Sequence, residues 1–176
     1  DVETDGRRAV VAFTDDWAED AARRDFRLNA LYADRAGSIF DPTGHGVEDA
    51  RAGRVVFVGE AETRIREDAL RILRFFRFQA HFGRGEPDAA GLTACARLAA
   101  LVEGLSAERV STELLKLLAA EDPRPAVRAM AETGVLARVL PGHVDLPMFE
   151  TMVAVSPDPA LRLSALLPAD ADGVRE

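Results

Sequence analysis

Residues 67–78 carry apolar and charged side chains with the spacing of an α-helix, and this stretch limits the fold more than any other. Wound as a helix, it gathers its apolar side chains on one side: Leu70, Leu73, Phe76 and Ala80, with Ile72, Phe75, Phe78 and Phe82 beside them. A narrow polar seam remains, formed by Asp68, Arg71, Arg74 and Arg77. We predict one helix over residues 63–83, with its apolar side in the core and its seam outside the core.

The seam contains a candidate base-reading pair, Asp68 and Arg71, because residues three apart are neighbours on a helical surface. Cytosine and adenine each present an exocyclic amine, which needs an acceptor, beside an unprotonated ring nitrogen, which needs a donor. Guanine and uracil present the reverse polarity. A rigid carboxylate and guanidinium edge would therefore select C and A, at about 1–3 kcal/mol per bidentate contact. Arg74 and Arg77 would lie within reach of a triphosphate.

An ordinary amphipathic helix would show the same pattern, with an i,i+3 salt bridge and solvated arginines. Such a pair contributes only about 0.2–0.5 kcal/mol to helix stability. On this interpretation the chain is a noncatalytic helical interaction domain. It would then hold Arg71 and Arg74 in salt bridges on an outer face, with no concave site beside them.

The chain after residue 88 has helical periodicity throughout. We predict helices over residues 88–103, 107–120, 123–132, 135–140, 147–155 and 158–167, joined by short links as in an α-bundle. Arg109 and Glu113 lie four residues apart in the second of these helices, and we expect them to lock helices together rather than to contact substrate.

The chain before residue 63 mixes short strands with short helices. We predict strands at residues 8–14 and 38–41, an apolar extended run at 55–58, and helices at 17–25 and 47–52. The glycine-rich loop 41–46 ends the second strand, and His45 within it is interpreted as a turn or surface residue. So few strands cannot form an independent sheet, so this part is predicted to be incomplete.

Composition and charge exclude several classes of protein. The chain is 48% hydrophobic, enough for a buried core, but no apolar run approaches the roughly 20 residues that cross a bilayer. No leader opens the chain, so we expect a soluble cytoplasmic protein without a membrane partner. The net charge of −8 argues against a general polyanion binder, so any RNA contact must be local. The single cysteine, Cys95, is expected to be buried in helix packing.

Three strings of the sequence, taken together, resemble a known family. Residues 19–31 read EDAARRDFRLNAL, residues 41–50 read DPTGHGVEDA, and residues 67–78 read EDALRILRFFRF. Their order and approximate spacing resemble those of the class II tRNA nucleotidyltransferases, the CCA-adding enzymes, and of the bacterial poly(A) polymerases of the same superfamily. Residues 105–114, which read LSAERVSTEL, also resemble a motif of this family. The resemblance covers about residues 8–141.

The resemblance implies a mainly α fold in three parts. Residues 1–58 would be the remnant of an α/β nucleotidyltransferase head, residues 59–122 a helical neck that recognises the base, and residues 123–176 part of a helical body. In the family, the arginine and aspartate that match Arg24 and Asp25 contact the ribose. The implied nucleotide-binding set is Arg24, Asp25, Asp68, Arg71, Arg74 and Arg77.

Nucleotidyl transfer also needs two metal ions held by close carboxylates. In the family these come from an Asp-x-Asp on a strand beside a glycine-rich turn, and this sequence has neither feature. The only such string, Asp170-Ala171-Asp172, lies in a tail that we interpret as a solvated loop. We therefore expect Mg²⁺ in the intact enzyme, catalytic carboxylates upstream of Asp1, and no catalysis by this chain alone.

The function implied by the resemblance is template-independent addition of CMP and AMP, from CTP and ATP, to the 3′ end of tRNA. Enzymes that add only A, only C or poly(A) share these motifs, so a poly(A) polymerase of the same superfamily stays an alternative. A phosphohydrolase of the His-Asp type is disfavoured, because the sequence contains no His-Asp doublet.

Overall fold

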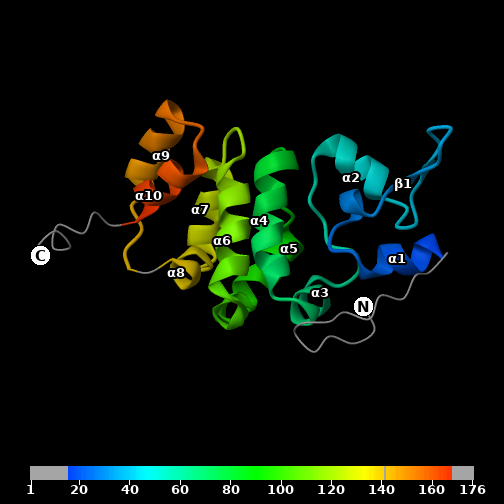
Figure 1. Ribbon diagram of the computed structural model, residues 1–176. Coiled ribbons are helices and arrows are strands. Elements are labelled where there is room, and N and C mark those ends of the chain that lie inside the picture. Colours follow the sequence, from blue (N-terminus) through cyan, green and yellow to red (C-terminus); the bar gives the residue numbers. More distant parts are fainter. Residues whose placement is uncertain (1–15, 141, 168–176) are drawn as a thin grey trace, which may run out of the picture.

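The computed structural model describes residues 16–140 and 142–167 of the chain (Figure 1). The predicted strand at residues 8–14 and the predicted loop at residues 170–172 lie outside the described residues. The mainly helical class predicted from the sequence is confirmed. No helix in the described ranges is both long enough and apolar enough to cross a membrane.

Short helices and one hairpin come first along the chain, followed by a set of packed helices. The elements are α1 (Trp17–Arg23), the 3₁₀ helix η1 (Arg27–Asn29), β1 (Tyr32–Ala33), β2 (Ile39–Phe40), α2 (Gly46–Ala52), α3 (Ala61–Glu67), α4 (Leu70–Phe82), α5 (Ala89–Arg97), the 3₁₀ helix η2 (Ala99–Gly104), α6 (Ala107–Leu118), α7 (Arg124–Glu132), α8 (Leu136–Val139), α9 (Leu146–Val155) and α10 (Pro159–Leu166). Strands β1 and β2 pair antiparallel, with Tyr32 opposite Phe40 and Ala33 opposite Ile39.

Helix α4 lies at the centre of the structure (Figure 1). It packs against α6 and α7, and the α9–α10 pair packs on α6 at the far end. The residues predicted for the core side of this helix are mostly buried, including Ile72, Leu73, Phe75, Phe76 and Phe78. Phe82 is the exception at 55% exposed, because the helix ends there.

An aromatic cluster joins the first part of the chain to α4. Phe26 and Phe57 form an isolated antiparallel bridge, with ring centroids 4.9 Å apart. Phe57 stacks on Phe75 of α4 at 5.6 Å, and Phe26 contacts Phe78 of α4 at 4.9 Å. Burial of aromatic rings is among the largest apolar contributions to stability. The extended run predicted at residues 55–58 is therefore the link that carries this contact.

A close backbone approach fixes α2 against η1. Gly46 is the first residue of α2, and a Cβ atom there would lie only 2.5 Å from the carbonyl oxygen of Arg27. Only glycine fits so close an approach. The glycine-rich loop therefore sets where α2 begins and holds it on the segment that follows α1.

The single helix predicted over residues 63–83 is wrong, because the chain breaks at Asp68. Asp68 has φ −153° and ψ 108°, which are extended values, and it separates α3 from α4. Its Oδ1 atom accepts a hydrogen bond of 3.0 Å from the backbone N–H of Leu70. An aspartate that bonds the backbone two residues on competes with helix continuation and favours a helix start. The helix predicted over residues 88–103 is also divided, into α5 and η2.

Arg162 is a buried cation that joins α10 to the end of α6. Its side chain is only 3% exposed, and its Nη1 atom donates to the carbonyl oxygens of Leu118 and Ala120, both at 2.7 Å. Its Nε atom donates to the carbonyl of Ser156 at 2.8 Å. The last carbonyl groups of a helix lack partners within the helix, so this guanidinium satisfies the end of α6.

We predict that Arg162→Met lowers the free energy of unfolding by about 2–4 kcal/mol, because the carbonyl groups that it satisfies would stay buried without a donor. Urea unfolding of the chain measures this. The control is Arg66→Met, which breaks an exposed i,i+4 pair with Glu62. The control should change stability by less than about 1 kcal/mol. Equal effects of the two substitutions would contradict the capping role of Arg162.

Candidate functional site

The residues predicted to bind nucleotide line one cavity between the end of α1 and the start of α4. Its volume is about 300 Å³. The lining residues are Arg23, Arg24, Asp25, Asn29, Asp68, Leu70, Arg71 and Arg74. The structure thus brings together all the predicted residues except Arg77, although they come from segments more than 40 residues apart in the chain.

Asp25 and Arg74 form the central contact of this cavity. Asp25 is 4% exposed, and its Oδ2 atom lies 2.6 Å from Nε and 2.5 Å from Nη2 of Arg74. Its Oδ1 atom accepts from the backbone N–H of Phe26 and from Nδ2 of Asn29, both at 3.0 Å. A buried carboxylate needs this number of donors to offset its loss of water. Asp25 therefore fixes the first segment on α4.

Arg24 is oriented by a group at the edge of the cavity. Its Nε and Nη2 atoms donate to Oδ2 of Asp20, both at 3.0 Å, and its guanidinium lies 5.3 Å from the centre of the Tyr32 ring. The hydroxyl of Tyr32 donates to the same Asp20 oxygen at 2.5 Å. The Tyr32 hydrogen bond, and then that of Arg24, hold the pKa of Asp20 below its ordinary value. Asp20 thus stays charged and keeps Arg24 in place.

Arg71 is held by three groups from two segments. Its Nη1 atom donates to Glu67 at 2.6 Å and to the carbonyl of Arg64 at 2.9 Å, and its Nη2 atom donates to the carbonyl of Arg23 at 2.9 Å. Its side chain is only 15% exposed. The guanidinium therefore has a fixed position between α1, α3 and α4.

Asp68 has a partner that the sequence did not predict. Arg109 of α6 places its Nη2 atom 3.0 Å from Oδ1 and 2.9 Å from Oδ2 of Asp68. Arg109 and Glu113 were predicted to lock helices together, and both residues contact partners outside α6: Arg109 contacts Asp68, and Glu113 lies beside Arg77. The only sequence signal was that Arg109 lies in a string shared with the family, and the pattern did not reveal which acid it would meet.

Arg77 was predicted to share the seam, but the structure turns it toward α6. Its Nε atom lies 2.6 Å from Oε2 of Glu113, which is buried, and neither atom has a well-aligned hydrogen bond. Its guanidinium lies 4.7 Å from the centre of the Phe78 ring. Arg77 does not line the cavity, because the buried carboxylate of Glu113 draws it to the helix interface instead.

A larger cavity of about 900 Å³ adjoins the first one. The two cavities share Arg23, Asp68 and Arg71. The larger one is also lined by Glu19, Ala22, Arg64, Glu67 and Arg109. Asp68 and Arg71 therefore lie between two hollows, and a ligand can approach them from either side. Arg71 and Arg74 form the salt bridges that the alternative of a noncatalytic interaction domain predicts, but that alternative also predicts no concave site beside them.

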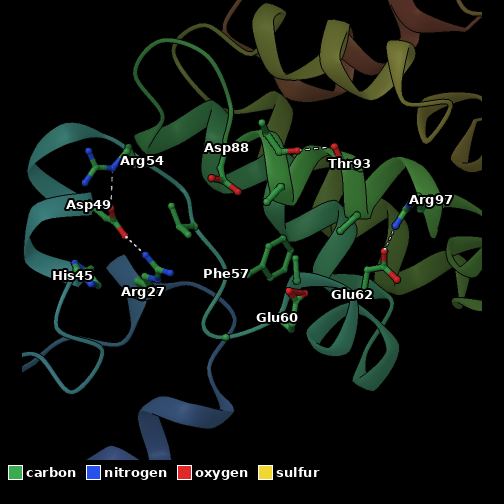
Figure 2. A pocket seen from close by; sticks show the side chains of 16 residues that line it. Arg27, His45, Asp49, Arg54, Phe57, Glu60, Glu62, Asp88, Thr93 and Arg97 are labelled. Carbon is green, nitrogen blue, oxygen red and sulfur yellow. Dashed lines mark hydrogen bonds and ion pairs between the residues drawn. The ribbon is translucent and has the colours of Figure 1, made fainter.

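Another hollow, of about 810 Å³, lies between α2 and α5 and contains none of the predicted nucleotide-binding residues (Figure 2). Two ion pairs occupy part of its lining: Asp49, which is 1% exposed, accepts from Nε of Arg54 at 2.8 Å, and Arg97 donates to Glu62 at 3.0 Å. His45 at its edge is exposed, as the sequence predicted. The first pair lies within and just after α2 and the second joins α3 to α5, so both have the character of structural contacts.

The described residues provide no set of ligands for a metal ion. No three His, Cys, Asp or Glu side chains in these ranges lie close enough together to hold one. The expectation that Mg²⁺ is held by carboxylates outside this chain stays a prediction. Cys95 is buried, as predicted, and this burial raises the pKa of its thiol, which disfavours the reactive thiolate.

Two protein families match the sequence of this chain. Residues 1–56 match the family described as "Poly A polymerase head domain". Residues 87–146 match the family described as "Probable RNA and SrmB- binding site of polymerase A". The segment between these matches contains Asp68, Arg71 and Arg74.

Known relatives match most of the chain. The CCA tRNA nucleotidyltransferase 1, mitochondrial, of Mus musculus is 37% identical over 182 residues, which is 98% of this chain and 41% of that protein. The CCA-adding enzyme of Geobacillus stearothermophilus is 41% identical over 143 residues, which is 81% of this chain and 34% of that protein. The chain thus spans less than half the length of these relatives.

A solved structure has the same fold over most of the chain. It is the crystal structure of the Bacillus stearothermophilus CCA-adding enzyme in complex with CTP, with a TM-score of 0.68 and 37% sequence identity. The match covers 81% of this chain and 35% of that one.

We predict that Arg74→Met lowers the free energy of unfolding by about 2–4 kcal/mol, because it leaves the buried carboxylate of Asp25 without its cation. Asp25→Asn combined with Arg74→Met should cost less than the sum of the two single changes, by at least about 1 kcal/mol. Urea unfolding of the chain and its three variants measures this coupling. Additive effects would show that the two side chains stabilise the fold independently.

Proposed function

We propose that the protein containing this chain belongs with the CCA-adding tRNA nucleotidyltransferases and adds CMP and AMP, from CTP and ATP, to the 3′ end of tRNA. The match of residues 1–56 to a poly(A) polymerase head domain and the identity to CCA-adding enzymes over most of the chain support this. The observation that carries the proposal is the cavity that gathers Arg24, Asp25, Asp68, Arg71 and Arg74. The match of residues 87–146 to an RNA-binding family supports the choice of RNA as a partner.

The proposed base selection uses one acceptor and one donor. The Oδ1 atom of Asp68 already accepts from the N–H of Leu70, so Oδ2 is the oxygen with more free capacity for an amine. Arg71 would donate to the unprotonated ring nitrogen beside that amine. The break at Asp68 does not remove this chemistry, because both side chains still line the same cavity.

Selection against G and U follows from the polarity of these groups. A carbonyl oxygen placed against Asp68 would face another acceptor, and a ring N–H placed against Arg71 would face another donor. A buried polar group without a partner costs about 1–3 kcal/mol. Discrimination of roughly tenfold to a hundredfold is therefore within reach of this pair.

The other residues hold the nucleotide and the pair in place. Arg24 lies beside Asp25 at the cavity wall, and we assign it to the ribose or the phosphates of the nucleotide. Asp25 would meet the ribose hydroxyl only through lone pairs that its present donors leave free. Arg74 holds Asp25, and Arg77 would act only from the interface with α6.

The catalytic step is assigned to parts of the intact protein beyond this chain. When bound there, Mg²⁺ would activate the RNA 3′-hydroxyl and stabilise the leaving pyrophosphate. Within the chain we assign residues 1–58 to the head, 59–122 to the neck and 123–176 to the body. The end of the head-domain match at residue 56 supports the first of these boundaries.

A poly(A) polymerase is the second candidate function, and the descriptions of both matching families favour it. It would use the same edge for A alone. The two candidates differ in the acceptance of CTP, so nucleotide incorporation distinguishes them.

We predict that Asp68→Ala in the full-length protein reduces its preference for CTP and ATP over UTP and GTP by roughly tenfold or more, because the acceptor for the amine is lost. Binding of Mg²⁺ should not change. Incorporation of each nucleotide on tRNA that lacks CCA measures the preference. A variant that still adds C and A in order would show that Asp68 does not read the base.

A further inference from the structure

One partner of Asp68 lies on α6, a helix that has no role in the proposed function so far. One oxygen of its carboxylate accepts from the N–H of Leu70, and both oxygens contact Nη2 of Arg109, at 3.0 and 2.9 Å. Arg109 lies on α6, 41 residues further along the chain. It also lines the larger cavity, beside Asp68 and Arg71.

The orientation of the Asp68 carboxylate decides which lone pair an incoming base would meet. The terminal torsion of an aspartate side chain is broad, so the bond to the Leu70 N–H alone would let the second oxygen turn. One nitrogen of Arg109 contacts both oxygens, so it holds the end of the Asp68 side chain toward α6, while the Leu70 N–H restrains the rotation of Oδ1. Together the two contacts restrict the directions in which Oδ2 can accept a further hydrogen bond.

The geometry of α6 favours this role for Arg109. Arg109 and Glu113 are one helical turn apart, yet each pairs with a residue outside α6: Arg109 with Asp68, and Glu113 with Arg77. The two pairs hold α6 to the beginning and to the middle of α4. The position of α6 therefore sets the position of the Asp68 carboxylate.

Stability alone gives a weak reason for the Asp68–Arg109 pair. Their side chains are 38% and 48% exposed, and ion pairs so exposed contribute little to stability. Loss of such a pair would lower the stability of the fold only slightly. The pair can nevertheless control the direction of a contact in the site.

We propose that Arg109 is a positioning residue for base selection, which holds the Asp68 carboxylate in the orientation that accepts the amine of C or A. The proposal rests on the proposed function, because it assumes that Asp68 reads the base. It adds a residue of α6 to the specificity of the site, and it links the segment that matches an RNA-binding family to the choice of nucleotide.

The test compares Arg109→Leu, Arg109→Lys and Asp68→Ala in the full-length protein, with incorporation of all four nucleotides on tRNA that lacks CCA. Arg109→Leu should reduce the ratio of kcat/KM for CTP to that for UTP by about tenfold, as one misplaced bidentate contact predicts. Most of the loss for CTP should appear in KM. Arg109→Lys should restore part of the ratio, because an ammonium group can still hold one carboxylate oxygen.

The matched control is Arg138→Leu. Arg138 pairs with Glu103 across two elements, with exposed side chains, and it lines neither cavity of the site. The control should leave the CTP to UTP ratio unchanged. Thermal melting of each variant identifies any loss of fold, and Arg109→Lys provides the test if Arg109→Leu does not fold.

The outcomes separate this inference from the proposed function. If Asp68→Ala reduces the ratio and Arg109→Leu does not, the positioning role of Arg109 is wrong while base reading by Asp68 stands. If Asp68→Ala leaves the ratio unchanged, base reading itself is wrong. If both reduce it, the double variant should be no worse than Asp68→Ala, because Arg109 acts through Asp68. An additive double variant would overturn the proposal.

Discussion

The site depends on the contact between Asp25 and Arg74. The carboxylate is buried beside the backbone of Phe26, and four donor atoms from Phe26, Asn29 and Arg74 surround its two oxygens. The ring of Phe26, the residue after Asp25, packs on the rings of Phe57 and Phe78. Apolar packing brings the first segment to α4, and the ion pair fixes its position, because a buried charge tolerates little displacement from its partner. Without this contact the cavity would lose one wall.

The pattern of the sequence predicted the helical class and most of the buried side of α4, and the family resemblance implied the grouping of the cavity residues. It failed at Asp68, where an aspartate inside an otherwise helical pattern bonds the backbone of Leu70 and starts a new helix. Local spacing does not reveal this, because an aspartate at such a position can also remain in a helix with its side chain in solvent. The partners of Arg77, Arg109 and Arg162 were missed for another reason. Each partner lies on a different element from its arginine, so tertiary packing decides which group the arginine contacts.

The distribution of charge explains how an acidic protein can still offer a local site for a nucleotide. The chain has a net charge of −8, yet the arginines of the cavity are concentrated where α1, α3 and α4 meet. Arg24, Arg71 and Arg74 are each held by a carboxylate or a carbonyl group before any ligand arrives. Groups that are already in place lose less conformational entropy on binding, which favours a defined geometry over a strong general attraction for polyanions.

In the proposed base selection, a carboxylate and a guanidinium of the protein replace a pairing nucleobase. A crystal structure of the full-length protein with CTP would show whether they do. We expect the cytosine amine within hydrogen-bonding distance of Asp68 and the unprotonated ring nitrogen facing Arg71. A base found in the hollow between α2 and α5, or bound with Asp68 and Arg71 turned away from it, would show that this pair does not read the base.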